Sequence, residues 1–314
     1  MGRTRIVLVG SAGSTLRTLE GLVRNDCHVV GVLGCGPDVD LAALSVSQGI
    51  PYFEFESLGA KTSKATLRSL APDVLFIVGL SQLADDEVLA IPHAGTVGFH
   101  PTRLPRMRGR APIAWLILEQ ADGAATFFAM DAGVDTGPIL VQEPFQVGDG
   151  DYASDVLSHM DAAIDRALDR WLPKLRESTT LEGAPQDEAD ASFRGRRAPK
   201  DGEINWSASA IEIARLVRAT SRPHPGARTF YAGSTITIWR AAAVESECVG
   251  AVGRVLRVGG DSFLVQTGDG CLEVLEFETE AGASIPGVGA RLTIAVEAEI
   301  AKLRADIEDL KQQL

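Results

Sequence analysis

The stretch DVLFIVG, Asp73–Gly79, is the clearest indication of the fold in this chain. Its apolar residues run from Val74 to Val78 without the alternation that marks a strand with one face in water. Strands that are buried on both faces have this composition, and they lie in the interior of parallel sheets. The stretch therefore predicts a central strand of a parallel sheet.

Strand and helix patterns alternate on both sides of this stretch. Extended patterns lie at Arg5–Gly10, Cys27–Gly34, Ile50–Phe55 and Gly95–His100, and helical patterns at Ser14–Asn25, Asp40–Gly49, Ser63–Pro72 and Asp85–Pro92. This alternation predicts an α/β fold with an open, Rossmann-like, mostly parallel sheet and helices on both of its faces. Ligands of such sheets bind outside the carboxyl ends of the strands, where Gly79-Leu80-Ser81 and His100 are expected.

Length, charge and cysteine spacing bound the class of protein. The chain has 314 residues and a net charge of −12, which suits a globular protein of two domains and argues against a nucleic-acid partner. No apolar run is long enough for a membrane span, and Ile6–Val9 is too short for a signal peptide, so we expect a cytoplasmic protein. The four cysteines lack metal-ligand spacing, so reduced thiols and no metal are expected.

Near residue 180 the sequence becomes polar and rich in charged residues and proline, and this change predicts the domain organisation. We expect an α/β catalytic domain over residues 1–180 and a polar linker over 181–204. A helical pattern over Ile204–Thr220, with Ser207 or Ser209 near its start, precedes short alternating segments separated by glycines. These segments predict a second domain over residues 205–295, a helix followed by a small, OB-like β-barrel.

The last residues, 296–314, form a heptad pattern. Apolar residues recur at Val296, Ile300, Leu303, Ile307, Leu310 and Leu314. Isoleucine at a and leucine at d favour a parallel dimeric coiled coil, so we expect a homodimer through this helix, with the second domain as a further candidate contact. The alternative is an amphipathic helix that packs on its own barrel, which would bury the same stripe.

Two further stretches carry the chemistry. The first holds His100, the loop Pro101-Thr102-Arg103-Leu104-Pro105, Gly109 and Pro112, and the second holds Asp135-Thr136-Gly137. Together they resemble the formyltransferases that use 10-formyltetrahydrofolate. In that family an Asn-x-His triplet precedes a Ser-Leu-Leu-Pro loop, and an Asp-Thr-Gly follows downstream.

The resemblance implies a formyl transfer from folate to an amine. His100 would act as general base and proton shuttle, and Asp135 would orient its ring. It also implies folate contacts by Val78, Gly79, Leu80, Ser81, Gln82, Leu83, Asp131 and Gly133. The chain departs from the family at Gly98, which stands where the asparagine that stabilises the oxyanion is expected.

Three explanations of Gly98 compete. A backbone N–H, or the side chain of Gln82 or Thr102, takes over as oxyanion donor. The enzyme is slower or transfers a different group. Or the site is inactive and remains as a regulatory module that binds folate or a nucleotide sugar.

The acceptor is the second open question. Substrate contacts are expected from Thr102, Arg103, Arg106, Arg108, Gly109, Arg110 and Pro112, because arginines bind phosphates well. Such a cluster could also be a solvated surface. The Arg-Gly-Arg-Ala-Pro run resembles the sugar-nucleotide enzymes, which implies an amino-sugar nucleotide as acceptor. The alternative is a divergent methionyl-tRNA formyltransferase, although the stretch Gly34–Pro51, where those enzymes carry a basic loop, has no lysine or arginine.

Overall fold

The computed structural model describes residues 3–36, 38–281, 284–296, 300, 303–304 and 307. The chain divides into two compact units. The N-terminal unit comprises residues 1–112, 122–147 and 157–195, and the C-terminal unit comprises residues 113–121, 148–156 and 196–314.

A seven-stranded sheet forms the centre of the N-terminal unit, with the order β3-β2-β1-β4-β5-β7-β8. Its strands are β1 (Arg5–Gly10), β2 (His28–Cys35), β3 (Tyr52–Phe55), β4 (Val74–Ile77), β5 (Gly95–Thr102), β7 (Gly123–Ala129) and β8 (Ile139–Phe145). The first five strands in this order pair in parallel, and β7 pairs antiparallel with both β5 and β8. The predicted α/β fold with a mostly parallel sheet is thus confirmed, and the stretch that predicted it becomes β4, between β1 and β5.

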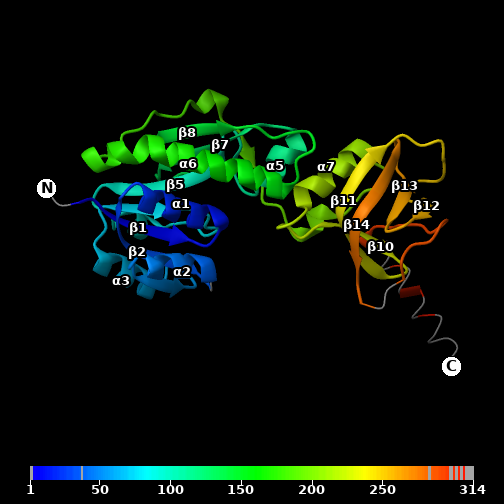
Figure 1. Ribbon diagram of the computed structural model, residues 1–314, viewed down its shortest axis with the longest axis horizontal. Coiled ribbons are helices and arrows are strands. Elements are labelled where there is room, and N and C mark those ends of the chain that lie inside the picture. The colour runs from blue at the N-terminus through cyan, green and yellow to red at the C-terminus, as the bar shows by residue number, and fades with distance from the viewer. Residues whose placement is uncertain are drawn as a thin grey trace. The chain divides into compact units, whose positions relative to one another are not determined.

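Helices cover both faces of this sheet (Figure 1). They are α1 (Gly13–Arg24), α2 (Val39–Ser47), α3 (Lys61–Leu70), α4 (Asp86–Leu89) and the long α6 (Ala153–Glu177). Leu75 of β4 belongs to a buried cluster with Leu67 of α3 and Val88 of α4. The next residue, Phe76, points to the other face, where its ring centroid lies 6.0 Å from that of Trp171 in α6.

The turn between β1 and α1 brings the carboxyl ends of β1 and β4 close together. A Cβ atom at Gly10 would lie 1.9 Å from the Val78 carbonyl oxygen, so only glycine permits this approach. Thr15 then donates a hydrogen bond of 2.7 Å to the same carbonyl. The small residues of the turn thus serve packing between the two strands.

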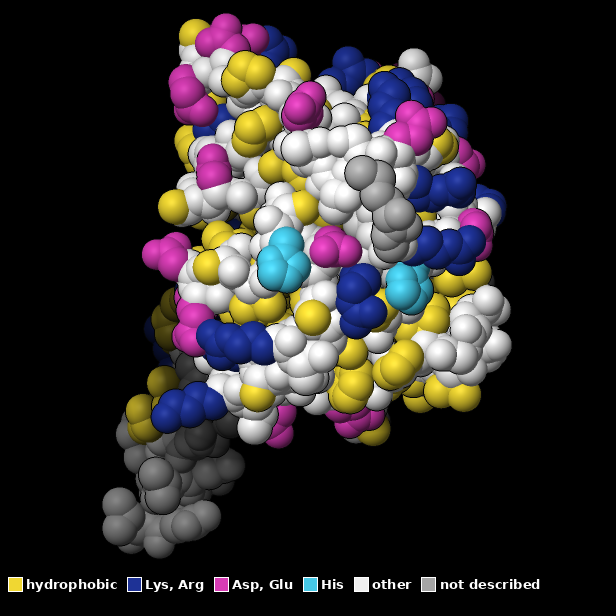
Figure 2. All heavy atoms as spheres, turned by 90° about the vertical axis from the view of Figure 1, so that its left-hand side faces the viewer, with side chains coloured by type: hydrophobic (Ala, Val, Ile, Leu, Met, Phe, Trp, Pro, Cys, Tyr) yellow, Lys and Arg dark blue, Asp and Glu magenta, His cyan; other side chains and the backbone are white. Residues whose placement is uncertain are grey.

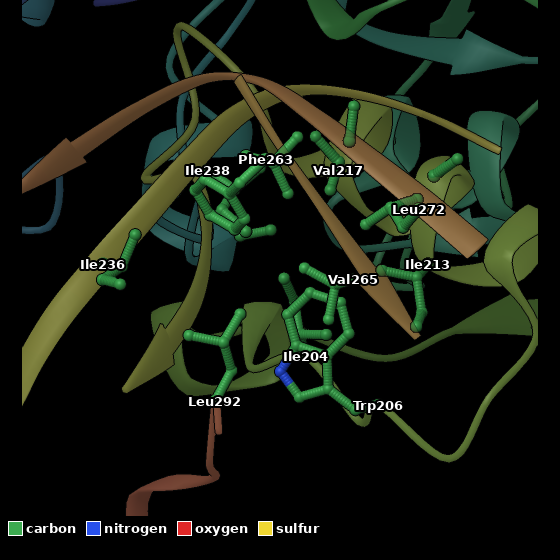
Figure 3. Close-up of a cluster of buried hydrophobic side chains, with 14 of the residues drawn as sticks. Ile204, Trp206, Ile213, Val217, Ile236, Ile238, Phe263, Val265, Leu272 and Leu292 are labelled. Atoms are coloured by element: carbon green, nitrogen blue, oxygen red, sulfur yellow. The ribbon is translucent and has the colours of Figure 1, made fainter. Parts of the chain in front are cut away.

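A five-stranded antiparallel sheet forms the C-terminal unit, with the order β10-β11-β14-β13-β12. The strands are β10 (Ala227–Tyr231), β11 (Ser234–Val244), β12 (Val255–Gly259), β13 (Ser262–Gln266) and β14 (Cys271–Thr279), and the unit also contains nearly all of α5 (Pro112–Glu119) and α7 (Ala210–Thr220). Figure 3 shows the apolar side chains of α7 and the strands converging in one core. Phe230 of the edge strand β10 and Arg254, directly before the edge strand β12, each form a bridge to the segment Arg291–Thr293. Closure into a barrel stays a prediction.

The helix α7 begins later than its sequence pattern predicts. Ser209 is its N-cap and accepts a hydrogen bond from the Glu212 backbone, so the helix starts at Ala210. Ile204 and Trp206 precede it and are buried in the same core, where the Trp206 indole donates to Thr229 at 2.9 Å. Their apolar character comes from this burial and not from a helical face.

The polar segment 181–204 contains ordered structure. It holds the 3-10 turns η1 (Glu188–Asp190) and η2 (Pro199–Gly202) and the short strand β9 (Phe193–Arg194). β9 pairs in parallel with β6 (Arg108–Gly109), which lies in the motif loop after β5. Part of the predicted linker therefore lies beside the first motif.

The N-terminal unit carries charges of both signs on its surface. On the face of the N-terminal unit in Figure 2, acidic and basic side chains are interspersed. Among the described residues, no helix is long and apolar enough to span a membrane. Of the predicted coiled coil, Leu310, Leu314 and most of the residues between the seam positions lie outside the described residues.

Candidate active site

His100 lies near the carboxyl end of β5 and is only 5% exposed. Its Nε2 atom lies 2.8 Å from the carbonyl oxygen of Met107 in the loop that follows. A carbonyl can only accept a hydrogen bond, so Nε2 carries the proton of this bond. In the neutral ring the free electron pair is then on Nδ1, which is the nitrogen that can accept a proton.

Asp135 reaches this nitrogen from the second motif. Its Oδ2 atom lies 3.6 Å from Nδ1 of His100 and accepts a hydrogen bond of 2.9 Å from the Gly109 backbone. Asp135 has a left-handed backbone conformation, with φ of 56°. A single amine nitrogen or water oxygen can lie within hydrogen-bond distance of both Nδ1 and Oδ2. The two motifs therefore meet at one point that suits proton transfer.

Hydrogen bonds from neighbouring side chains fix the loop after His100. Thr102 donates from its hydroxyl to the Arg106 carbonyl at 2.9 Å. On β7 and β8, Thr126 donates to the Thr102 carbonyl at 2.7 Å and Gln142 donates to the Leu104 carbonyl at 3.2 Å. Because the Thr102 hydroxyl proton is already used inside the loop, this side chain is a poor candidate for the oxyanion donor.

The four arginines of the loop have different environments. Arg108 is fully buried and binds Glu188 and Gln186. The other three are exposed: Arg103 lies 3.4 Å from Asp122, Arg106 lies 3.0 Å from Asp190, and Arg110 donates to the Ser81 carbonyl at 2.9 Å. Only these three are open to a ligand from solvent.

Gly109 and Pro112 serve the backbone of the same loop. A Cβ atom at Gly109 would lie 2.3 Å from the Arg194 carbonyl oxygen, so glycine lets β6 approach β9. Pro112 is the first residue of α5. Proline suits this position because the first turn of a helix needs no backbone donor there.

The predicted folate residues lie in two loops, one after β4 and one after β7. Val78 is buried, whereas Leu83 is 76% exposed. Between them, the Gln82 amide donates to the Glu56 carbonyl at 2.8 Å and accepts from the Leu58 backbone at 2.8 Å. Gln82 therefore holds the loop in place. Its amide already donates and accepts hydrogen bonds there, so Gln82 is, like Thr102, a poor candidate for the oxyanion donor.

In the second loop, Asp131 organises the turn that carries Asp135. Its carboxylate accepts hydrogen bonds from the Gly133 backbone at 2.9 Å and from the Thr136 hydroxyl at 2.5 Å. Val134, at the tip of this turn, is 45% exposed. Asp131 and Gly133 thus shape the loop through their own contacts.

Apolar side chains fill the space beside Gly98. A Cβ atom at this position would lie 2.7 Å from Cζ of Phe128 and 2.9 Å from Cγ of Met130. Phe128 is the residue opposite Gly98 in the β5–β7 pair. Phe128 and Met130 therefore occupy the space that a polar side chain at position 98 would need. Because the side chains of Gln82 and Thr102 already donate to other carbonyls, a backbone N–H is the best remaining candidate for the oxyanion donor.

Sequence reasoning missed three residues at this site, Gln186, Glu188 and Ser192. The Gln186 amide donates to the carbonyls of Asp135 and Gly137 at 2.8 and 2.7 Å. The Arg108 guanidinium holds the pKa of Glu188 below its usual range through their hydrogen bonds. All three residues lie in a polar segment typical of linkers, so composition alone carries no signal for them. No group of three or more metal-ligating side chains occurs in the part of the chain that the structure describes.

The sequence matches two known protein families. Residues 5–171 match the family "Formyl transferase", and residues 197–289 match "Formyl transferase, C-terminal domain". Among solved structures, HypX from Aquifex aeolicus, in complex with tetrahydrofolic acid, is similar with a TM-score of 0.65 at 18% identity, over 90% of this chain and 46% of that chain. This chain therefore spans about half the length of HypX.

Two N-formyl transferases are similar over their full length. WlaRD, a sugar 3N-formyl transferase solved with dTDP and 5-N-formyl-THF, has a TM-score of 0.64 at 16% identity, over 90% of this chain and 100% of that chain. The N-formyltransferase from Helicobacter canadensis, with folinic acid and dTDP-3-aminofucose, has a TM-score of 0.61 at 16% identity, over 88% and 100%. These identities show a shared fold. Since the first family match alone covers more than half of the sequence, the chain belongs to the formyl transferase family.

Proposed function

We propose that this protein transfers the formyl group of 10-formyltetrahydrofolate to the amine of an amino-sugar nucleotide. The observation that carries this proposal is the pair formed by His100 and Asp135. The imidazole Nδ1 and the carboxylate Oδ2 are 3.6 Å apart, and the other ring nitrogen is held by the Met107 carbonyl. Family membership accounts for the reaction class, and this pair accounts for the proton transfer.

The arrangement gives each group a role. An amine that lies between the two atoms would lose its proton to Nδ1 of His100 as its nitrogen bonds to the formyl carbon, while Nε2–H stays hydrogen-bonded to the Met107 carbonyl oxygen. The Asp135 carboxylate stabilises the imidazolium that forms and orients the amine through a hydrogen bond. General base catalysis of this kind contributes roughly 100- to 10,000-fold to the rate. The imidazolium would then return this proton to the folate nitrogen, whose bond to the formyl carbon breaks.

The loops after β4 and β7 suit a folate. The bound folate supplies the formyl group, and the loop residues Val78–Leu83 and Asp131–Gly133 would hold its pterin ring. Large apolar side chains are exposed on both loops, Leu83 at 76% and Val134 at 45%. Flat heteroaromatic rings bind well between such apolar side chains and backbone hydrogen-bonding groups. The site therefore fits the cofactor that the family implies.

Three exposed arginines support a phosphate-bearing acceptor. Arg103, Arg106 and Arg110 lie on the loop that begins at His100, and guanidinium groups bind diphosphates through paired hydrogen bonds. We leave Arg108 out of this set because it is buried and bound to Glu188. The ligands of WlaRD and of the Helicobacter canadensis enzyme, dTDP and dTDP-3-aminofucose, support the same class of acceptor.

The two alternatives remain distinct proposals. A divergent methionyl-tRNA formyltransferase would need a basic surface, and the net charge of −12 argues against it. A catalytically impaired regulatory protein that binds folate or a nucleotide sugar would be consistent with the apolar packing at Gly98. The retained pair of His100 and Asp135 favours catalysis, with a backbone N–H as oxyanion donor.

We further propose that the antiparallel sheet of the C-terminal unit closes into a small barrel and that the terminal helix forms a dimer. The bridges from Phe230 to Thr293 and from Arg254 to Arg291 support closure, because they join both sheet edges to one segment. Within residues 296–314, the described seam residues Val296, Ile300, Leu303 and Ile307 are all at least 44% exposed. This exposure favours a second copy of the chain over packing on its own domain.

Isothermal titration with a stable 10-formyltetrahydrofolate analogue, followed by a panel of amino-sugar nucleotides, tests the proposal. We expect both to bind and a formyl-transfer assay to show turnover with one sugar. Folate binding without turnover would support the regulatory alternative. Initiator tRNA at two salt concentrations is the comparison: affinity that falls steeply with salt would support the tRNA alternative. No folate binding would overturn the proposal.

A further inference from the structure

The segment Gln186–Arg194 lies against both catalytic motifs, although it belongs to neither. From the structure we infer that this segment positions the catalytic pair, with Gln186 as the central positioning residue. The inference rests on the proposed function, in which His100 and Asp135 transfer the proton.

The contacts of Gln186 join the two motifs through one side chain. Its amide nitrogen donates to the carbonyls of Asp135 and Gly137, at 2.8 and 2.7 Å. Its amide oxygen accepts from Nε and Nη2 of Arg108, at 3.2 and 2.9 Å. Both ends of the amide are therefore satisfied, one by the Asp-Thr-Gly turn and one by the loop after His100.

Arg108 is held from the same segment. The buried guanidinium donates to both carboxylate oxygens of Glu188, at 3.0 and 2.7 Å, and lies 5.6 Å from the ring centroid of Phe193. A buried cation is stable only when its hydrogen bonds are satisfied. Gln186 and Glu188 supply these bonds, so Arg108 serves to anchor the loop to the segment.

The segment also holds the carbonyl that fixes the His100 ring. The Met107 backbone donates to the Ser192 hydroxyl at 3.0 Å, and the Arg108 backbone donates to the Ser192 carbonyl at 2.8 Å. Met107 accepts the hydrogen bond from Nε2 of His100, so the ring orientation depends on this anchored strand. The β6–β9 pair and these bonds keep Met107 in place.

Asp135 needs such support because its backbone is unfavourable for most residues. Its φ of 56° lies in the left-handed region, which costs a non-glycine residue free energy unless its surroundings hold it there. The hydrogen bond from Gln186 to its carbonyl is one such restraint, and the bond from Gly109 to its carboxylate is another. Loss of the first would let the carboxylate move away from Nδ1.

Two substitutions separate the functions of the Gln186 amide. Gln186→Leu removes both ends, whereas Gln186→Glu keeps an acceptor for Arg108 and removes the donor to Asp135 and Gly137. We expect both to lower kcat by roughly 10- to 100-fold with KM for both substrates within about twofold, since a misplacement of about 1 Å has effects of this size. Glu182→Gln, at an exposed position of the preceding chain, is the matched control and should leave kcat unchanged.

A double-mutant cycle tests whether Gln186 acts through Asp135. In an Asp135→Asn background, Gln186→Leu should cost little further activity, because the group that it positions is already gone. Full additivity of the two losses would overturn the inference, and so would full activity of Gln186→Glu. Thermal unfolding shows whether Gln186→Leu folds; if it does not, Gln186→Glu carries the test.

Nuclear magnetic resonance gives a measurement that does not depend on turnover. The ring resonances of His100, assigned with His100→Gln, should move in the same direction in Gln186→Leu as in Asp135→Asn, because both changes withdraw the carboxylate from Nδ1. Unchanged His100 resonances in Gln186→Leu, beside shifted ones in Asp135→Asn, would contradict the positioning role. If the wild-type protein shows no formyl transfer, the proposed function fails, while these resonances still decide the positioning role.

Discussion

Phe128 fills the space into which a side chain at Gly98 would extend, with its Cζ atom 2.7 Å from where a Cβ atom would lie. Gly98→Asn should therefore destabilise the protein by about 1–3 kcal/mol, as overpacked substitutions in cores do. Chemical denaturation of the variant measures this loss in free energy of unfolding.

A second variant tests the cause of that loss. Phe128→Ala alone should destabilise by roughly 3–5 kcal/mol, because it leaves a cavity beside β5. In the double variant Gly98→Asn/Phe128→Ala, the asparagine occupies part of that cavity, so the loss should be smaller than the sum of the single losses. Additive losses would show that the phenyl ring is not what excludes a side chain at position 98.

The catalytic pair makes a prediction for activity. His100→Ala and Asp135→Asn should each reduce kcat by at least about 100-fold, because one removes the base and the other the charge that stabilises its protonated form. Binding of the folate analogue, measured by titration calorimetry, should stay within a few-fold of wild type. Retained turnover in either variant would rule out the proposed mechanism.

The ion pair of Glu188 with Arg108 predicts a pH dependence of stability. Hydrogen bonds from Arg108 lower the pKa of Glu188 below its unfolded value of about 4.5. The pair therefore stabilises the fold above that pKa, and the contribution is lost as the pH falls through the lower folded pKa. Glu188→Gln should reduce Tm at pH 7, and its difference from wild type should shrink toward pH 3. A difference that stays constant over this range would contradict the assignment.

The heptad pattern of residues 296–314 predicts self-association, so the average molecular mass in solution should rise with protein concentration. Truncation after Ala295 keeps the hydrogen bond from its backbone to Glu203 and removes the heptad seam. The truncated chain should show weaker self-association by light scattering at matched concentration. The double substitution Ile300→Asn/Leu303→Asn should have the same effect with the helix still present. An unchanged mass in both variants would place any dimer contact elsewhere.

The thiols predict an order of reactivity. Burial raises the pKa of Cys27 to about 11, so about one in a thousand of these thiols is ionised at pH 8. Cys248 is exposed. Mass spectrometry after brief treatment with iodoacetamide at pH 8 should find Cys248 modified and Cys27 intact. Equal modification of both in the folded protein would contradict the raised pKa of Cys27.

Local patterns predicted the parts of the fold that local physics determines. The apolar run Val74–Val78 predicted a central strand because a strand buried on both faces has no polar position, and β4 occupies that place. The pattern over Ile204–Thr220 was less informative: Ile204 and Trp206 are apolar because they enter the core, not because they lie on α7. Periodicity reports burial and cannot always say in which conformation a residue is buried.

The sequence by itself determined the α/β class, the family resemblance and the pair His100 and Asp135, since these depend on composition, short-range periodicity and motif spacing. Only the tertiary structure decided that Arg108 is a buried anchor rather than an exposed phosphate ligand and that Gln186 joins both motifs. The reason is that these roles depend on contacts between segments far apart in the chain. A polar residue in a polar segment looks the same in sequence whether it faces water or a buried guanidinium.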